Sequence, residues 1–367
     1  MKKSLILSLI LFIFLSEFCF VGDVFAQGNE DGEFPSSEGI VRDIIEEKEN
    51  DSGGYYQKLL VEPLSGKLRG QQVEIDHGVG DSPVTQRFAP GDRVVLVGYE
   101  DESGEITLFI DDFVRRDSIY ILFFIFLVLS VVVAGKRGFS SFIGMVITFF
   151  MIYRMVLPKL SSGSSPMLVV MVFSIVCVPI TFYLSHGINK KTNVAIAGTF
   201  IALLISVILS AIFVNSAKLT GFTSDEASFL QLLKGETFNM KGLLLGGIVI
   251  GMLGVLDDIT VSQAAIVFQL KEANRRLNFS ELYKRSMDVG KDHIASMINT
   301  LVLVYAGASL PLLLLFTDSS HTFSQVINYE IVASEIIRTL IGSIGLIIAV
   351  PITTFIAVSV ADSEKEV

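Results

Sequence analysis

Residues 242–270 read GLLLGGIVIGMLGVLDDITVSQAAIVFQL, and this stretch decides the fold class. Asp257 and Asp258 are its only charged residues. A run of 18 or more mostly apolar residues predicts a transmembrane helix, because about 20 helical residues cross about 30 Å of hydrocarbon. As one helix the stretch would be about 43 Å long, more than one crossing needs. We therefore expect it to be tilted, re-entrant or interrupted.

Apolar stretches of similar length surround it in the C-terminal two thirds of the chain. Of the 367 residues 51% are hydrophobic, and the mean hydropathy is +0.61, which is too apolar for an ordinary soluble domain. The sequence predicts an α-helical polytopic membrane protein with about seven spans, at residues 119–134, 139–157, 167–184, 194–214, 242–270, 293–316 and 331–360. The membrane domain is assigned to residues 118–362, followed by a cytoplasmic tail at 363–367.

Residues 1–26 are typical of an export signal. Lys2 and Lys3 precede an apolar run, and Val24-Phe25-Ala26 offers small residues where a signal peptidase cuts. A cleaved signal peptide and an uncleaved signal anchor both stay open, and both export the segment that follows. The only cysteines are Cys19 and Cys177, so no disulfide framework and no thiolate metal site is expected.

Residues 27–117 are predicted to form an acidic extracytoplasmic β-domain. They hold 21 Asp and Glu against 9 Lys and Arg, a net charge of −12. Turn residues separate five short runs that read as strands, at 39–45, 56–61, 71–75, 93–99 and 106–110. Five strands in so short a domain suggest a small closed barrel, and an OB-like barrel is the favoured form. The basic groove that nucleic acid requires is absent from the sequence, so nucleic acid is excluded as a partner.

The basic residues predict the orientation in the membrane. With the β-domain outside, the inner loops hold ten Lys and Arg, whereas the outer loops after the first span hold four. Lysine and arginine accumulate in cytoplasmic loops. The sequence therefore predicts a multi-pass protein of a cell membrane, with the C-terminus in the cytoplasm and the lipid bilayer as its immediate partner.

The two aspartates carry the functional hypothesis. A carboxylate inside the bilayer costs at least about 2.5 to 3.5 kcal/mol unless it faces protein or water, so it is presumed functional. Asp258 shares a stripe of small and polar residues, whereas Asp257 points about 100° away on a straight helix. A break near residues 251–259 would let both converge on a cation or proton, as in transporters with discontinuous helices. The predicted substrate- or ion-binding residues are Asp257, Asp258, Thr260, Ser262 and Gln263, with the kind of metal left open.

Two further features belong to this hypothesis. Gly247, Gly251 and Gly254 form a predicted helix-packing face, because glycines at such spacing let a neighbouring helix approach closely. Arg154 and Arg338 are candidate counter-ions for an aspartate. The alternatives are that Arg338 pairs with Glu335 three residues away, that Arg154 extends to the membrane surface, and that the aspartates cap a helix or lie at the cytoplasmic interface.

Enzymatic motifs are missing from the sequence. It contains no phosphate loop, no HExxH zinc helix and no GxSxG nucleophile elbow. We therefore expect neither an enzyme nor a bound cofactor.

The stretch GMLGVLDDITVSQ, residues 251–263, together with an exported β-domain and a multi-span region, resembles the YibE/F-like family of bacterial membrane proteins. The resemblance implies a polytopic fold in the membrane, and transport is only a suggestion attached to that topology. Two hypotheses follow. The chain is a permease or ion-coupled transporter of an unknown small solute or ion, or it is a non-transporting scaffold, receptor or sensor whose external β-domain binds a ligand. A homo-oligomer or a complex with another membrane protein is compatible with either.

Overall fold

The computed structural model describes residues 33–49, 55–78, 86–100, 106–235, 238–317 and 322–362. The predicted signal segment 1–26 and the tail 363–367 lie outside these residues. The chain forms two compact units, and the boundary between them lies between Ile125 and Phe126. Each unit is described below by itself.

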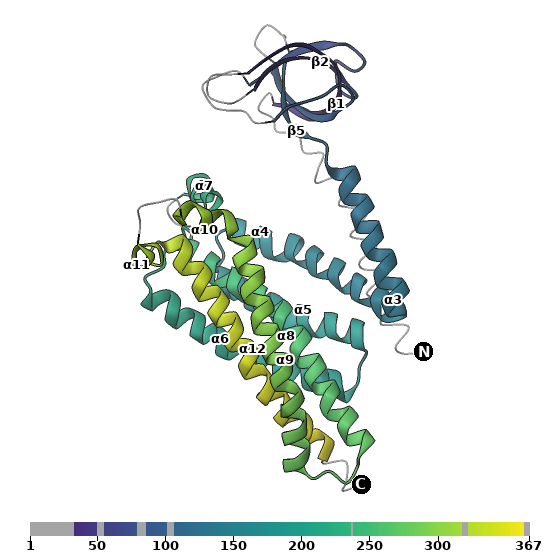
Figure 1. Ribbon diagram of the computed structural model, residues 1–367, viewed down its shortest axis with the longest axis vertical. Helices are drawn as coiled ribbons and strands as arrows, with labels where there is room; N and C mark the ends of the chain where they lie inside the picture. The colour runs from purple at the N-terminus through teal and green to yellow at the C-terminus, as the bar shows by residue number, and fades with distance from the viewer. Residues whose placement is uncertain are drawn as a thin grey trace. The chain divides into compact units, whose positions relative to one another are not determined.

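The first unit is built on a five-stranded antiparallel sheet that is almost closed into a barrel (Figure 1). Its strands are β1 (Glu33–Glu49), β2 (Tyr55–Pro63), β3 (Val73–His77), β4 (Arg93–Glu100) and β5 (Ile106–Phe113), in the order β3-β2-β1-β4-β5. The long strand β1 pairs with both β2 and β4, and register shifts along it mark bulges. Bulges bend a strand and increase its twist, which allows one strand to serve both halves of a barrel. The five predicted strands and the small barrel are confirmed.

Alternating apolar side chains fill the barrel. Val41, Leu59, Val61 and Leu96 are at most 1% exposed. Gln57 is also fully buried, and its side-chain amide exchanges two hydrogen bonds with the backbone of Phe88, at 3.0 and 2.8 Å. Since a buried amide is stable only when its polar atoms are bonded, Gln57 fixes the segment that leads into β4.

Ion pairs join the barrel to the first residues of helix α3 (Arg116–Met151). Arg93 on β4 contacts Glu38 at 2.7 Å and Asp117 at 2.5 Å, and Arg116 also pairs with Glu38. These side chains are partly exposed to solvent, where a single ion pair contributes little to stability. Because Arg93 and Arg116 share Glu38 as a partner, the pairs form a network.

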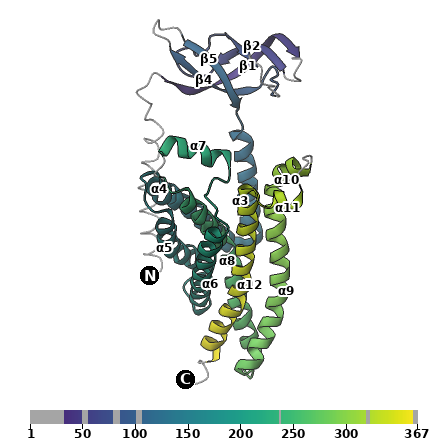
Figure 2. The ribbon, with the colours of Figure 1, turned by 90° about the vertical axis from the view of Figure 1, so that its left-hand side faces the viewer.

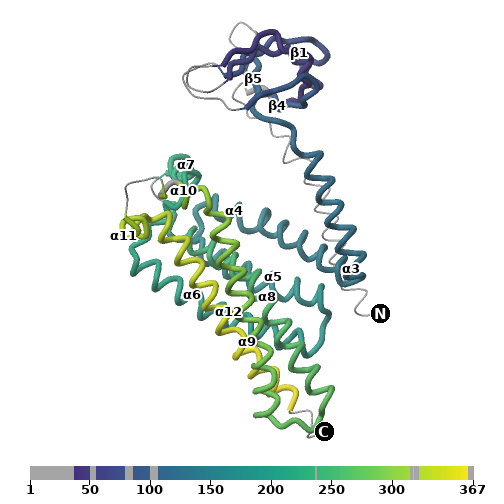
Figure 3. The backbone as a smooth tube through the Cα atoms, in the orientation of Figure 1, coloured from purple at the N-terminus to yellow at the C-terminus, as the bar shows by residue number. Residues whose placement is uncertain are grey.

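Helix α3 reverses direction at Gly135, which has φ 59° and ψ −135° (Figure 3). A Cβ atom at Gly138 would collide with the carbonyl oxygen of Ser130, although eight residues of one straight helix span about 12 Å. Two antiparallel helical stretches therefore meet here, with Lys136 and Arg137 at the turn. This break lies between the predicted spans 119–134 and 139–157.

The second unit has a central layer of three long helices, α6 (Lys190–Ser216), α8 (Met240–Ala273) and α12 (Glu330–Asp362), which pack on one another. Figure 2 shows α9 (Phe279–Ala308) running along α12, and α5 (Pro166–His186) packs on α8. Shorter elements complete the unit: the π-helix η1 (Ile152–Val156), α4 (Leu157–Ser161), α7 (Asp225–Lys234), α10 (Leu310–Thr317) and α11 (Phe323–Val326).

Glycines allow the helices of this unit to approach closely at three points. A Cβ atom added to Gly198 would collide with Thr353. One added to Gly290 would lie 2.7 Å from Val350, and one added to Gly345 would lie 2.7 Å from Met252. Small residues at such positions are the usual means by which apolar helices gain packing contacts in a membrane.

In the part of the chain that the structure describes, five helical stretches are long and apolar enough to cross a membrane: Arg116–Ser161, Pro166–His186, Lys190–Ser216, Met240–Ala273 and Glu330–Asp362. The first of them contains the break at Gly135. The predicted span 293–316 is divided between α9 and α10, because Pro311 cannot continue a preceding helix. The polytopic helical class agrees with these stretches, and the number of seven spans stays a prediction.

Polar contacts hold both ends of α12. At its start Glu330 accepts hydrogen bonds from the backbone nitrogens of Thr220 and Gly221, at 2.6 and 2.7 Å. At its end Asp362 pairs with Lys271 of α8 at 3.0 Å. The position of α12 along α6 and α8 is thereby fixed.

Candidate functional site

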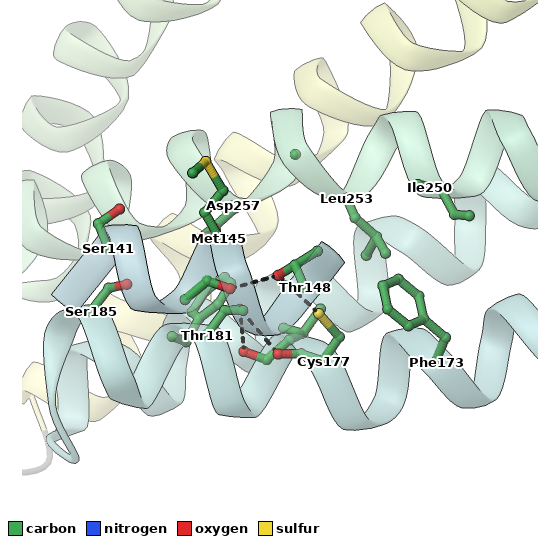
Figure 4. A pocket seen from close by; sticks show the side chains of 14 residues that line it. Ser141, Met145, Thr148, Phe173, Cys177, Thr181, Ser185, Ile250, Leu253 and Asp257 are labelled. Atoms are coloured by element: carbon green, nitrogen blue, oxygen red, sulfur yellow. Dashed lines mark hydrogen bonds between the residues drawn. The ribbon is translucent and has the colours of Figure 1, made fainter. Parts of the chain in front are cut away.

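Asp257 of α8 faces a cavity of about 290 Å³ between α8, α5 and the second half of α3. Figure 4 shows side chains from these three helices converging on the cavity. The carboxyl group is half-buried, and among the described residues no ion pair or hydrogen bond to it is formed. The polar residues that line the cavity with it are Ser141 and Thr148 of α3, and Cys177, Thr181 and Ser185 of α5.

The hydroxyl groups of this cavity are oriented by backbone carbonyls. Thr148 Oγ1 donates to the carbonyl oxygen of Gly144 at 3.0 Å and lies 3.5 Å from Cys177 Sγ. Thr181 Oγ1 donates to the carbonyl oxygen of Cys177 at 3.0 Å. A hydroxyl oxygen that donates its hydrogen to a carbonyl still has lone pairs with which it can accept a hydrogen bond. One carboxylate and several hydroxyl oxygens form a ligand set suited to a proton or a hard monovalent cation.

A multidentate transition-metal centre is not supported by the donor set. Within the described residues there is no group of three or more His, Cys, Asp or Glu side chains that could hold a metal ion. Asp257 is the one carboxylate among the cavity-lining residues that the structure describes. A single negative charge balances one positive charge, which favours a monovalent ion over a divalent one.

Asp258 does not share the cavity. Helix α8 is continuous over its 34 residues and is not interrupted near residues 251–259, so the two aspartates point in different directions. The side chain of Asp258 is exposed on the helix surface. In this conformation the two carboxyl groups therefore do not meet at one ligand, because a straight helix separates adjacent side chains by about 100°.

The other predicted ligands have structural contacts. Thr260 is fully buried, and its hydroxyl lies 2.8 Å from the hydroxyl of Thr199 on α6. Gln263 is fully buried between α9 and α12, where Nε2 donates to the carbonyl oxygen of Ser286 at 3.0 Å and to the hydroxyl of Thr354 at 2.7 Å. Ser262 is half-buried. None of the three lines the cavity of Asp257.

The predicted packing face on α8 differs from the observed one. A Cβ atom at Gly247 or Gly254 would meet no atom within 4 Å, and one at Gly251 would make only an ordinary contact of 3.5 Å with Tyr305. These glycines leave open space, and Gly254 lines the cavity of Asp257. Small residues permit close packing but do not require it, so the spacing alone was misleading.

Neither predicted counter-ion reaches Asp257 or Asp258 in the described part of the chain. Arg338 Nη1 lies 3.2 Å from Glu335 Oε1, which is the local pairing offered as the alternative. Arg154 is exposed within the π-helix η1. Among the described residues no ion pair joins either arginine to Asp257 or Asp258.

The hydroxyl residues of the cavity were not predicted from the sequence. A signal was present, because Ser141, Gly144 and Thr148 follow one another at helical spacing, as do Cys177, Thr181 and Ser185. Each set places small polar residues on one face of an apolar helix. What could not be read from the sequence is that these two faces lie opposite Asp257.

Long apolar helices and a half-buried carboxylate among hydroxyl groups define the class as a membrane protein with an internal polar site. The family model described as YibE/F-like protein matches residues 122–363, about two thirds of the chain. The chain belongs to this family, as its aspartate-containing motif predicted. No curated protein and no solved structure is significantly similar to it.

Proposed function

We propose that the protein is an ion-coupled permease in which Asp257 binds a proton or a monovalent cation during transport of a small solute. The observation that carries the proposal is the cavity in which one carboxylate faces several hydroxyl groups between three apolar helices. An ionisable side chain within such helices is costly, and it persists where binding or proton transfer needs it. The proposed role requires no enzymatic step and no cofactor.

The position of Asp257 along α8 supports this role. Asp257 is the 18th of the 34 residues of α8, so about 26 Å of helix precede it and about 24 Å follow it. A ligand at mid-helix could be reached from either side after a modest movement of the flanking helices, which is the usual arrangement in permeases. Gly254 beside it leaves the space that such a movement needs.

The proposal places the protein in a bacterial cell membrane with the β barrel outside and the C-terminus in the cytoplasm. Its support is the accumulation of basic residues in the loops on one side and the export signal expected at residues 1–26. An OB-like barrel outside the membrane would be the part that meets the solute or a partner protein first.

The test uses the full-length protein in liposomes that contain a pH-sensitive or sodium-sensitive dye, with a membrane potential set by potassium and valinomycin. We expect wild type to carry proton or sodium flux, and Asp257→Asn to lower that flux at least tenfold. Asp292→Asn is the matched control, because Asp292 is an exposed aspartate outside the cavity.

Binding is measured in parallel, because an unidentified solute could be needed for flux. The melting temperature of the detergent-solubilised protein is compared in sodium chloride and in choline chloride, and at pH 5 and pH 8. The difference between conditions should shrink in Asp257→Asn and persist in the control. Equal flux and equal cation and pH responses in wild type and Asp257→Asn would refute the proposal.

A sensor or receptor role is the second candidate, and one observation on the barrel favours it. Tyr99 and Phe109 stack on the outer face of β4 and β5 with ring centroids 5.8 Å apart, beside exposed Val97. Exposed aromatic clusters are common at ligand and protein contacts. This role predicts that deletion of residues 38–113 abolishes function, whereas Asp257→Asn has little effect.

A further inference from the structure

A second cavity, of about 500 Å³, gathers basic side chains where three helical stretches begin or end. Arg137 follows the reversal in α3, His186 is the last residue of α5, and Lys190 and Lys191 are the first residues of α6. Among the described residues that line the cavity there is no Asp or Glu. Among the described residues, the wall of the cavity therefore carries the positive charges of Arg137 and Lys191 and the ring of His186, and it carries no carboxylate.

The backbone adds to this positive field. Asn189 caps α6 by accepting a hydrogen bond from the backbone nitrogen of Thr192 at 3.0 Å. The 27-residue helix directs the positive end of its dipole towards the cavity, and this end of a helix favours an anion. Asn189 also bonds the carbonyl oxygens of His186 and Gly187, at 2.8 and 3.2 Å, which fixes the loop between α5 and α6.

The opposite wall is mostly apolar. Val261, Ala265 and Phe268 of α8 line the cavity, and Gln269 adds one polar group. A phosphate group bound by the basic residues would thus have an apolar surface next to it. That combination matches an anionic lipid, whose headgroup is charged and whose acyl chains are not.

The level of the cavity along the helices agrees with a membrane surface. Apolar stretches end at Ala134 and Leu184 and begin at Val194, and the basic residues lie directly beyond these ends. Gln269 is about 18 Å along α8 from Asp257, roughly half the thickness of a hydrocarbon core. A preference of basic residues for cytoplasmic loops would explain their number. It would not explain why side chains from three helices meet around one cavity.

We propose that this cavity binds a phosphate-bearing anion, with Arg137, Lys190 and Lys191 as its charged contacts and the N-terminus of α6 as its backbone contact. Two sources share this chemistry, the headgroup of an anionic phospholipid and a soluble phosphate. The proposal is independent of ion binding at Asp257, because no residue is common to the two cavities.

The test uses the purified full-length protein in detergent with dioctanoyl phosphatidylglycerol, dioctanoyl phosphatidylcholine or inorganic phosphate as the added ligand. Bound lipid is counted by native mass spectrometry, and the melting temperature reports phosphate binding. The variants are Arg137→Gln and Lys191→Gln, both of exposed or half-exposed residues. The matched control is Lys159→Gln, an exposed basic residue of α4 outside the cavity.

The expected result is that wild type and Lys159→Gln bind phosphatidylglycerol at least fivefold more than phosphatidylcholine, and that each cavity variant loses this preference. If 10 mM phosphate raises the melting temperature of wild type and control but not of the cavity variants, and no lipid preference is found, the site is for soluble phosphate. The proposal is overturned if the cavity variants bind phosphatidylglycerol and respond to phosphate as wild type does. It is overturned equally if wild type shows neither response.

Discussion

Gln263 of α8 and Thr354 of α12 are joined by a hydrogen bond of 2.7 Å in a fully buried setting. The same amide nitrogen also donates to the carbonyl oxygen of Ser286 on α9, at 3.0 Å. One side chain thus connects three helices, and it leaves Gln263 Oε1 and Ser286 Oγ buried without a hydrogen-bond partner among the described residues. Such atoms are costly without water or a partner, so a buried water at this point would complete the contacts.

Gln263→Ala should therefore destabilise the helical unit by about 1–3 kcal/mol, because it removes two buried hydrogen bonds and leaves a space. We expect the melting temperature in detergent to fall by several degrees. Thr354→Val should have a smaller effect, since the bond from Gln263 to Ser286 remains. Ser359→Ala is the control, because the exposed Ser359 hydroxyl bonds only within α12. A melting temperature of Gln263→Ala equal to that of the control would contradict this account.

Gly345 and Gly342 of α12 allow a paired test of helix packing. A Cβ atom at Gly345 would meet Ser206 Oγ at 2.5 Å and Met252 Cε at 2.7 Å, whereas one at Gly342 would meet nothing within 4 Å. Gly345→Ala should cost about 1–3 kcal/mol through overpacking. Gly342→Ala should be neutral or stabilise by about 0.5–1 kcal/mol, because alanine is the better helix former. Thermal unfolding of the two variants under identical conditions tests the order, and a reversed order would show that α6, α8 and α12 are packed differently.

The sequence predicted the barrel well because its signals are local. Each turn between strands carries Gly, Pro, Asp or Ser, and each strand is a short alternating or apolar run, so five strands could be placed. The bulges of β1 were not predicted, because they depend on pairing with two partners at once. The buried Gln57 was also missed, since its partner Phe88 lies 31 residues away.

The helical unit was predicted in outline but not in its contacts. The overlong span 242–270 was identified by composition, and it corresponds to the 34-residue α8. Which glycines allow close approach depends on the neighbouring helix, so Gly198, Gly290 and Gly345 were missed while Gly247 and Gly254 were chosen. Asp257 was identified because a charge in an apolar helix is conspicuous. Its hydroxyl neighbours come from α3 and α5, more than 70 residues away, and no local pattern pairs them with it.

Gly254 offers a test of the cavity that does not alter its carboxylate. Gly254→Val should fold normally, because a Cβ atom there meets nothing within 4 Å, but its side chain would occupy the cavity of Asp257. We expect at least a tenfold loss of the proton or sodium flux that wild type carries. Gly247→Val is the matched control, since it is equally unhindered and lies two turns away, outside that cavity. Equal flux in the two variants, with both correctly folded, would show that the cavity is not on the transport route.

His77 at the end of β3 makes the stability of the barrel depend on pH. Its ring packs edge-to-face on Phe88 with centroids 4.8 Å apart, and Nε2 is buried without a hydrogen-bond partner among the described residues. Burial lowers the pKa of His77 below its usual value of 6.5, because the apolar surroundings disfavour the charged form. The folded state therefore binds the proton less readily than the unfolded chain does.

This difference in proton binding makes the barrel less stable at low pH. The contribution of neutral His77 to stability is fully present above pH 6.5 and is lost as the pH falls towards the lowered pKa of the folded state. We expect the urea midpoint of the isolated barrel, residues 27–117, to fall between pH 7.5 and pH 5 by more in wild type than in His77→Gln. Carboxylates that titrate in the same range act equally on both proteins, so the difference between the two isolates the histidine. The same fall in both proteins would mean that His77 is solvated in the folded barrel and that its burial against Phe88 is not maintained in solution.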